Sequence, residues 1–314
     1  MKFIDLFAGI GGFRYGLERT KGYKCVYSNE WDKYAAQIYT KHYRECDTRD
    51  IRNVKSNEIP NFDLLVGGFP CQAFSIAGKR GGFSDTRGTL FFEIARILAD
   101  KRPRYFILEN VKGLLSHDEG KTFQTILGVL TDLGYEYQWQ VLNSKNFGVP
   151  QNRERVFIIG NLRGTPRPKV FPVGQGDTKN DNERILAHTL NSSDWRGGNR
   201  NQKQTTLEYI GGIVGKRDKW LKDGKDNSRN FSQGQRVYGT KGISSTLAGN
   251  AGGLGGKTGL YQTDMKIRRL TPTECERLQG FPDGWTEGIS DTQRYKCLGN
   301  AVTTNVVEYI GRNL

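Results

Sequence analysis

The chain has 314 residues, of which 36% are hydrophobic and 25% are charged, so we expect a folded protein with a sizeable core. No apolar run approaches the roughly 20 residues that a membrane helix needs, and we expect neither a membrane span nor a signal peptide. The net charge is +14, and residues 161–266 hold 18 Lys and Arg against 9 Asp and Glu. So uneven a basic charge favours a polyanionic partner.

The cysteines are few and scattered. Cys25, Cys46, Cys71, Cys275 and Cys297 form no C-x-x-C pair, and the three histidines lie far apart. This pattern indicates a reducing compartment without a disulfide framework, and we expect a cytoplasmic protein with no metal.

The first 160 residues alternate strand and helix patterns. Strands are predicted at 2–9, 24–30, 63–68, 104–110 and 155–161, and helices at 12–20, 32–43, 89–101 and 121–134. Such alternation predicts an α/β fold, a Rossmann-like, mostly parallel sheet with helices on both faces. Ligands of such sheets bind beyond the carboxyl ends of the strands.

The pattern changes after residue 162, where Pro, Gly and polar residues dominate. We interpret residues 181–266 as a smaller, irregular, β-rich domain. Residues 271–280 predict a helix with Thr271 as its N-cap and Glu274 three residues later. The last fifteen residues predict a helix that returns to the first domain. The expected boundaries are therefore 1–180 with 292–314 for the first domain, 181–266 for the second, and 267–291 for a hinge.

A glycine turn, "DLFAGIGG" at 5–12, follows the first predicted strand. Glu30 ends the second strand about 20 residues later, as suits a carboxylate that holds ribose hydroxyls. The turn alone does not separate NAD from S-adenosylmethionine, since both carry an adenosine. It lacks the G-x-G-x-x-G spacing, which disfavours a dinucleotide.

A second group carries reactive side chains. Cys71 lies in the loop "GGFPCQAFS", and Glu109 ends an apolar strand. Arg153 and Arg155 stand two residues apart before another strand, so both side chains are expected to face the same way. Arginines that converge on a thiol and a carboxylate are typical of a reaction centre for a planar or anionic substrate.

Together these motifs resemble the cytosine-C5 DNA methyltransferases, especially the compact bacterial enzymes of restriction–modification systems. "DLFAGIGG", "NEW", "GGFPCQAFS", "ENV", "QNRER", "RRLTPTECERLQGFP" and "LGNAV" occur in the family's order along the whole chain. The resemblance implies that Cys71 attacks cytosine C6 and that Glu109 donates a proton to N3. It also implies that Arg155 contacts the base oxygen, with Arg153 supporting the loop or a phosphate.

The resemblance further implies a cofactor and a substrate. The cofactor is S-adenosyl-L-methionine, the product S-adenosyl-L-homocysteine, and the substrate a cytosine flipped out of double-stranded DNA. The implied cofactor residues are Phe7, Ala8, Gly9, Gly11, Gly12, Glu30, Trp31, Asp50, Ile51, Pro70, Leu90, Asn300 and Ala301. The implied DNA-binding residues are Ser75, Arg87, Gln233, Arg236, Tyr238, Thr246 and Asn250. A nucleoid-associated monomer is expected, with a cognate restriction endonuclease but no stable complex with it.

Three alternatives stay open. A tRNA cytosine-C5 methyltransferase would use the same chemistry, but Phe69 rather than proline precedes Pro70, and residues 162–266 contain no cysteine. A non-catalytic DNA-binding module is disfavoured by the intact set of reactive residues. A nucleotide-dependent oxidoreductase is disfavoured by the incomplete dinucleotide turn.

Overall fold

The computed structural model describes residues 1–70, 90–173, 209–214, 219–222, 236–238, 244–249, 257–263 and 266–314. Its contacts divide the chain into two compact units. The first comprises Met1–Leu142, Glu154–Gly174 and Val306–Leu314, and the second Asn143–Arg153 and Gln175–Asn305. The loop at 143–153 thus belongs to the second unit, whereas the boundaries at 180, 266 and 291 stay predictions.

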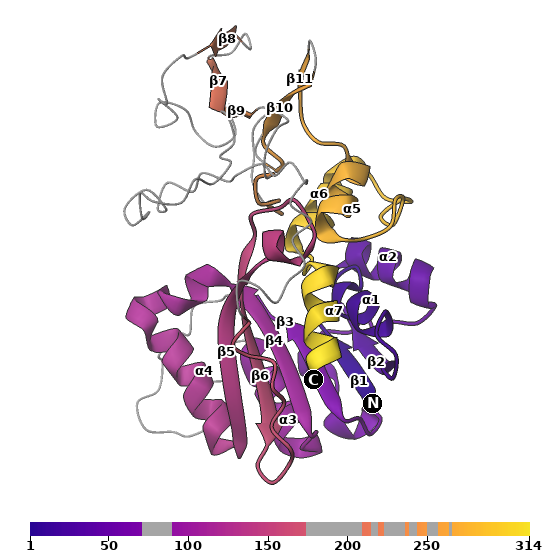
Figure 1. Cartoon of the computed structure of the whole chain (residues 1–314). Coiled ribbons are helices and arrows are strands. Elements are labelled where there is room, and N and C mark those ends of the chain that lie inside the picture. The colour runs from indigo at the N-terminus through magenta and orange to yellow at the C-terminus, as the bar shows by residue number, and fades with distance from the viewer. Residues whose placement is uncertain are drawn as a thin grey trace. The chain divides into compact units, whose positions relative to one another are not determined.

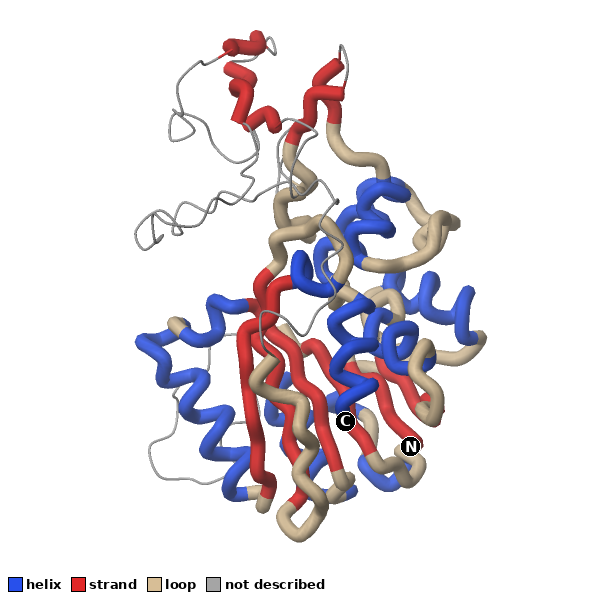
Figure 2. The backbone as a smooth tube through the Cα atoms, viewed as in Figure 1, coloured by secondary structure: helices blue, strands red, loops and turns tan. Residues whose placement is uncertain are grey.

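The first unit is a six-stranded sheet covered by helices (Figures 1 and 2). Its strands are β1 (Lys2–Leu6), β2 (Lys24–Asn29), β3 (Leu64–Gly68), β4 (Tyr105–Val111), β5 (Tyr135–Asn143) and β6 (Glu154–Leu162). Its helices are α1 (Gly12–Glu18), α2 (Lys33–Tyr43), α3 (Leu90–Lys101) and α4 (Lys121–Asp132). The strand order is β2-β1-β3-β4-β6-β5; β2, β1, β3 and β4 pair in parallel, and β6 is antiparallel to β4. This confirms the mostly parallel α/β sheet.

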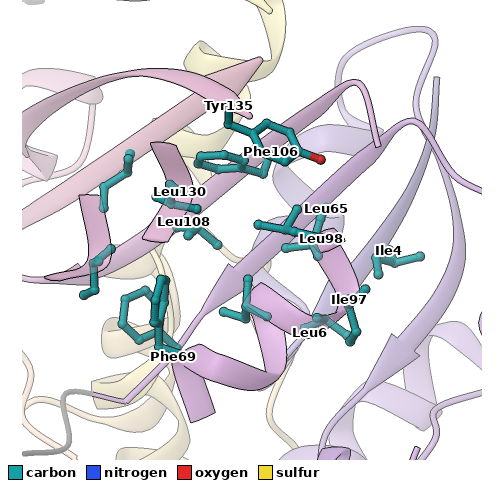
Figure 3. Packing of buried hydrophobic residues seen from close by; sticks show 14 of the residues in the cluster. Ile4, Leu6, Leu65, Phe69, Ile97, Leu98, Phe106, Leu108, Leu130 and Tyr135 are labelled. Carbon is teal, nitrogen blue, oxygen red and sulfur yellow. The ribbon is translucent and has the colours of Figure 1, made fainter. Parts of the chain in front are cut away.

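The core of this unit lies between the sheet and helices α3 and α4 (Figure 3). Ile94, Ile97 and Leu98 of α3 recur at three- and four-residue spacing, and all are fully buried. They pack with strand residues such as Leu65 and Leu108. Burial of such side chains contributes about 1.5–3 kcal/mol each, which fixes α3 against the sheet.

Strand β5 was not predicted from the sequence. It is an edge strand, and most of its residues are only partly buried or exposed. The side-chain amides of Gln138 and Gln140 exchange hydrogen bonds with the backbone of Pro168, Phe171 and Val173. Polar side chains thereby tie a neighbouring segment to the strand, and its sequence lacks the apolar run that marked the central strands.

The second unit contains a five-stranded sheet, α5 (Pro272–Gln279) and α6 (Asp291–Asn300). The sheet has the order β11 (Lys266–Arg268), β10 (Leu260–Thr263), β9 (Arg236–Tyr238), β7 (Tyr209–Val214) and β8 (Lys219–Lys222). Thr271 and Glu274 form the predicted capping box of α5. The last helix is α7 (Thr304–Asn313). From the sequence, Asn300 was expected in this helix, but it is the last residue of α6.

Among the described residues, no helix has both the length and the apolar character that crossing a bilayer requires.

Asp5 is a carboxylic acid inside the first unit. It lies on β1, is 0% exposed, and neither carboxyl oxygen has a hydrogen-bond partner among the described residues. Burial raises the pKa of Asp5 well above its ordinary value, and the charge of Arg14 offsets only part of that rise. The folded state therefore favours the protonated acid, and the unfolded chain releases the proton at lower pH.

We predict that Asp5→Asn stabilises the protein at alkaline pH. A carboxyl whose pKa is raised on folding lowers stability as pH rises through the folded-state value, and an amide does not titrate. The free energy of unfolding should increase by about 1–3 kcal/mol at pH 9. The gain should shrink as the pH falls toward 5, as measured by urea unfolding.

Asp63→Asn serves as the control, because the Asp63 carboxylate accepts an exposed hydrogen bond from the backbone of Lys2. It should show no such pH-dependent gain. A variant Asp5→Asn that is less stable than the parent at every pH would contradict the prediction.

Candidate active site

The glycine turn after β1 has an unusual backbone. Phe7 has φ 55° and Gly11 has φ 87°, both in the left-handed region. A Cβ atom at Gly11 would lie 2.6 Å from the ring of Tyr43, so only glycine fits there. Glu30 closes the turn: its carboxylate accepts hydrogen bonds from the backbone N–H of Gly9 at 2.8 Å and of Asp32 at 2.7 Å. The turn and the end of β2 are thereby joined through one side chain.

A cavity of about 300 Å³ opens beside this turn, large enough for a nucleoside-sized ligand. It is lined by Phe7, Asn29, Glu30, Trp31, Asp50, Ile51, Arg52, Pro70 and Leu90. The predicted residues Ala8, Gly9, Gly11 and Gly12 shape the turn rather than the lining. Asn29 and Arg52 were not predicted, although Asn29 opens the "NEW" motif and Arg52 stands two residues after Asp50.

The cavity wall carries more negative than positive charge. Arg52 donates to both carboxylate oxygens of Asp50, at 2.5–3.0 Å, and this pair lowers the pKa of Asp50. Burial raises the pKa of Glu30 above its ordinary value, while its two backbone hydrogen bonds oppose that rise. Trp31 is 69% exposed, so its ring is accessible to a ligand. The lining thus combines acceptor oxygens with an accessible aromatic face.

An ion pair lies at the ends of β4 and β6. Arg155 Nε is 3.0 Å from Glu109 Oε1, with 15% and 11% of these side chains exposed. In the antiparallel register, Glu109 pairs with Phe157 and Arg155 with Val111, so the two charged side chains are diagonal neighbours on one face. Burial lowers the pKa of Arg155, and the Glu109 carboxylate partly restores it. The geometry holds the carboxyl group of Glu109 in one orientation.

Strand β3 brings a third element to the same place. Gly68 pairs with Glu109 in the parallel register, and a Cβ atom at Gly68 would lie 3.1 Å from Glu109 Oε2. The side chain of Asn110 donates to the carbonyl of Phe69 at 2.9 Å. The "ENV" segment therefore anchors the backbone two residues before Cys71.

Several predicted residues lie outside the described part of the chain: Cys71, Ser75, Arg87, Gln233 and Asn250. Arg236 begins β9, and only its backbone is described.

Arg153 does not share the site of Arg155. Its side chain is 1% exposed, and its guanidinium donates to the carbonyls of Leu247, Gly299 and Ala301 at 2.7–3.2 Å. Sequence reasoning expected the two arginines to face the same way. Since β6 begins at Glu154, Arg153 lies before the strand, where the two-residue alternation does not apply. Of its two expected roles, the geometry favours loop support over a phosphate contact.

The remaining predicted residues belong to the second unit. Tyr238 is fully buried and its ring packs against Tyr261 with centroids 5.8 Å apart, so it is a core residue and not a DNA contact. The β-prone sequence around it did not reveal which side of β9 is covered. Thr246 Oγ1 donates to the carbonyl of Asn152 at 2.5 Å and is partly exposed. Asn300 and Ala301 lie at the end of α6, and their cofactor role stays a prediction.

Comparisons with known proteins agree with the resemblance of the motifs. Residues 1–314 match the model of the family described as C-5 cytosine-specific DNA methylase. The chain belongs to this family. Among its relatives is Type II methyltransferase M.HhaI of Haemophilus parahaemolyticus, 41% identical over 100% of this chain and 94% of the relative. Type II methyltransferase M.HpaII of Haemophilus parainfluenzae is 38% identical over 99% of this chain and 88% of the relative.

Solved structures share the methylase fold. The Dnmt2 methyltransferase of S. pombe superposes with a TM-score of 0.68 at 20% identity, over 98% of this chain and 96% of that chain. A putative DNA modification methyltransferase encoded within a prophage of E. coli gives 0.64 at 18% identity, over 100% and 98%. The chain is thus a C-5 cytosine DNA methyltransferase of the restriction–modification type.

We predict that Gly68→Ala lowers methyl transfer about 10- to 100-fold while the protein stays folded. The new methyl group would lie 3.1 Å from Glu109 Oε2 and displace the carboxylate from Arg155, and small misplacements of reacting groups are costly. Steady-state transfer of a tritiated methyl group measures the effect, with circular dichroism to verify folding.

Gly113→Ala is the matched control, because a Cβ atom there meets nothing within 4 Å. Equal activity of the two variants would show that the space beside Glu109 is not critical.

Proposed function

We propose that this methylase transfers a methyl group from S-adenosylmethionine to C5 of a cytosine flipped out of a specific double-stranded DNA sequence, through a covalent bond to Cys71. The observation that carries the proposal is the buried Glu109–Arg155 pair, held beside the strand that leads into Cys71. It would modify host DNA in the cytoplasm of a prokaryotic cell, as a monomer beside a cognate restriction endonuclease.

The cavity beside the glycine turn fits S-adenosylmethionine. Glu30 and Asp50 offer acceptor oxygens for ribose hydroxyls and the adenine amine, and Phe7 and Trp31 offer rings for the adenosine. Arg52 is occupied by Asp50, so the described residues of the lining offer no uncommitted cation for a pyrophosphate, which argues against a dinucleotide. When bound, S-adenosylmethionine supplies an electrophilic methyl group on a positively charged sulfonium, which suits a wall with excess negative charge.

We predict that Glu30→Ala weakens binding of S-adenosylmethionine by about 1–3 kcal/mol, because a charged acceptor is lost from buried hydroxyls. Isothermal calorimetry on the free protein measures this affinity. Asp118→Ala, an acidic residue outside the cavity lining, is the control and should bind as the parent does. Unchanged affinity of Glu30→Ala, with the fold intact, would remove Glu30 from the cofactor site.

The thiols of the chain support Cys71 as the nucleophile. Burial raises the pKa of Cys25 and of Cys46 to about 12 and raises that of Cys275 too. Cys297 is also buried. Thiols in such surroundings stay protonated and unreactive. Cys71 itself lies outside the described residues, but it directly follows Pro70, an exposed residue two positions after the end of β3, the strand that pairs with β4 at Glu109.

The reaction needs C5 of cytosine to become nucleophilic. Attack of the Cys71 thiolate on C6 forms a C–S bond and moves electron density toward C5 and N3. Glu109, which takes up a proton as the base enters beside Arg155, donates it to N3 and stabilises the charge that develops there, while Arg155 contacts the base oxygen. After C5 has taken the methyl group, the C5 proton is lost to water, Cys71 leaves as thiolate, and N3 returns its proton to Glu109.

A cytosine inside a duplex does not expose C6, so the base has to leave the stack, at a cost of a few kcal/mol. We propose that the segment at 75–88, with Ser75 and Arg87, closes over the flipped base, and that residues 181–266 read the DNA sequence. Gln233 and Arg236 are the proposed base contacts, since an arginine pairs with guanine O6 and N7. Thr246 and Asn250 are proposed phosphate contacts.

We predict that Cys71→Ser nearly abolishes methyl transfer yet leaves DNA binding within about threefold, because the thiolate acts in bond formation rather than docking. Duplex DNA with 5-fluorocytosine at the target should trap the parent enzyme covalently, since fluorine does not leave as a proton does. Denaturing electrophoresis detects the adduct.

Cys46→Ser is the matched control and should form the adduct at the parent rate. An adduct of Cys71→Ser that forms equally fast would exclude Cys71 as the nucleophile. Transfer to tRNA in preference to duplex DNA would overturn the proposed substrate.

A further inference from the structure

Ile51 and Arg52 of the cavity wall lie on one short 3-10 turn, η1 (Ile51–Asn53), and Asp50, also in the wall, is the N-cap of this turn. This turn lies in the connection between α2 and β3, whose only bridge to the described part of the sheet joins Asp47 to Asn29 of β2. The side chain of Asn29 also donates to the carbonyl of Arg49, one residue before Asp50. Its own hydrogen bonds are few: Asn53 N–H donates to Asp50 and Val54 N–H to Ile51. The orientation of the turn toward the cavity therefore has to come from side chains.

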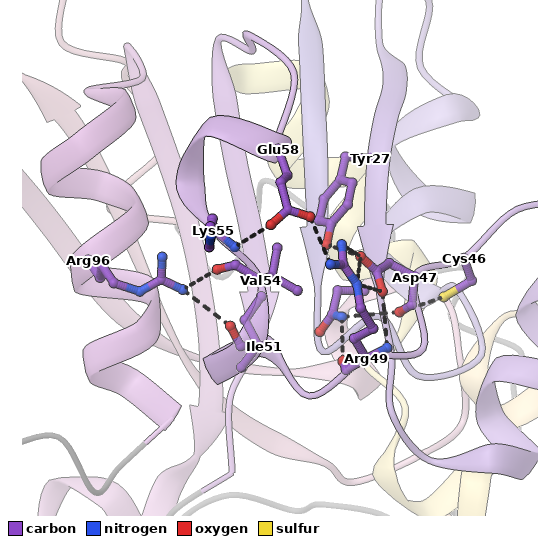
Figure 4. Close-up of polar contacts among 10 residues, drawn as sticks. Tyr27, Cys46, Asp47, Arg49, Ile51, Val54, Lys55, Glu58 and Arg96 are labelled. Atoms are coloured by element: carbon purple, nitrogen blue, oxygen red, sulfur yellow. Dashed lines mark hydrogen bonds and ion pairs between the residues drawn. The ribbon is translucent and has the colours of Figure 1, made fainter.

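Arg96 of α3 supplies that hold (Figure 4). Its Nη2 donates to the carbonyl of Ile51 at 3.2 Å and to the carbonyl of Val54 at 2.9 Å. Its Nη1 donates to Ser56 Oγ at 2.9 Å. A cation at the end of a helical turn, donating to the last carbonyls, both satisfies these acceptors and opposes the dipole of the turn.

Arg96 is itself fixed in place. Its Nε donates to Glu93 Oε2, one turn earlier on α3, at 2.8 Å. Ser56 Oγ, the acceptor of Nη1, in turn donates to Asp100 at 2.6 Å. A guanidinium held at three of its nitrogens presents its planar fork in one orientation, which a flexible ammonium does not.

Apolar packing alone does not orient the turn. Ile51 and Val54 are 2% and 1% exposed and pack in the core cluster that includes α3, so they set the depth of the segment. Packing is non-directional, however, and does not by itself satisfy or aim the carbonyls. The bonds from Arg96 are directional. Because Leu90, the first residue of α3, also lines the cavity, Arg96 links two walls of it through one helix.

We propose that Arg96 is a positioning residue that sets the affinity for S-adenosylmethionine by orienting the Asp50–Arg52 turn, without touching the cofactor. This inference rests on the proposed function, which assigns the cavity to that cofactor. Two consequences follow. Loss of Arg96 raises the dissociation constant and the KM for the cofactor, whereas kcat at saturating cofactor changes little. S-adenosylhomocysteine, which shares the adenosine, loses affinity by the same factor.

The test compares Arg96→Met with Lys101→Met by calorimetry and steady-state kinetics. Lys101 also lies on α3 and donates to a carbonyl of the same segment, that of Ile59 at 2.5 Å, but away from the cavity lining. Arg96→Met should raise the Kd for S-adenosylmethionine about 5- to 50-fold, as expected when buried carbonyls lose a charged donor. Lys101→Met should lower the thermal midpoint but leave that Kd within twofold.

Arg96→Lys keeps the charge without the planar fork, and its Kd for S-adenosylmethionine should fall between those of the parent and Arg96→Met. If Arg96→Met does not fold, the comparison is made with Arg96→Lys instead. If the parent enzyme binds the cofactor and Arg96→Met binds it equally well, the role proposed for Arg96 is wrong, whereas the proposed cofactor stands. Equal losses of affinity in Arg96→Met and Lys101→Met also overturn that role, since the effect would then be general destabilisation. A parent enzyme that does not bind S-adenosylmethionine refutes the proposed cofactor as well.

Discussion

The buried contact between Glu109 and Arg155 constrains everything around it. Removing a carboxylate and a guanidinium from water costs several kcal/mol for each ion, and only a well-formed pair offsets that cost. The pair needs β4 and β6 antiparallel, in a register that makes the two residues diagonal neighbours on one face. Glycine at position 68 also leaves room for the pair, because a Cβ atom there would lie only 3.1 Å from Glu109 Oε2. The positions of β3, β4 and β6 are thus all constrained by one charged contact.

Arg153 and Arg155 make different contacts because β6 begins between them, at Glu154. Arg155 lies inside β6 and reaches Glu109 across the sheet. Arg153 precedes β6, and its guanidinium joins three backbone carbonyls that are far apart in sequence, those of Leu247, Gly299 and Ala301. Arg155 holds the carboxylate of Glu109, the proposed proton donor, and Arg153 joins segments within the second unit. Their spacing alone would assign both the same role.

Sequence reasoning succeeded where a local pattern determines the structure. The apolar runs of β1, β3 and β4, the glycine turn and the Thr271 cap all follow from short-range rules, and the motif order gave the family. It failed where tertiary contacts decide. Strand β5 is held by glutamine amides, α6 buries only its last residues, and Tyr238 is covered by Tyr261. Arg52 was missed because its role depends on its pairing with Asp50.

The two halves of the site are built by different means, and their chemistry requires this. The carboxyl of Glu109, the proposed proton donor, is fixed by strand register, which permits little displacement, and proton donation would depend on such accurate placement. One wall of the proposed cofactor cavity is instead a short turn held by side chains, outside the strands of the sheet. Charge follows the same division. Glu30 and Asp50 place two carboxylates in the described cavity wall, which would suit the proposed sulfonium, whereas Arg155 places a cation beside Glu109, on the strand that pairs with β3. If both places carried charge of the same sign, that charge would stabilise either the cationic sulfonium or the anionic thiolate and destabilise the other.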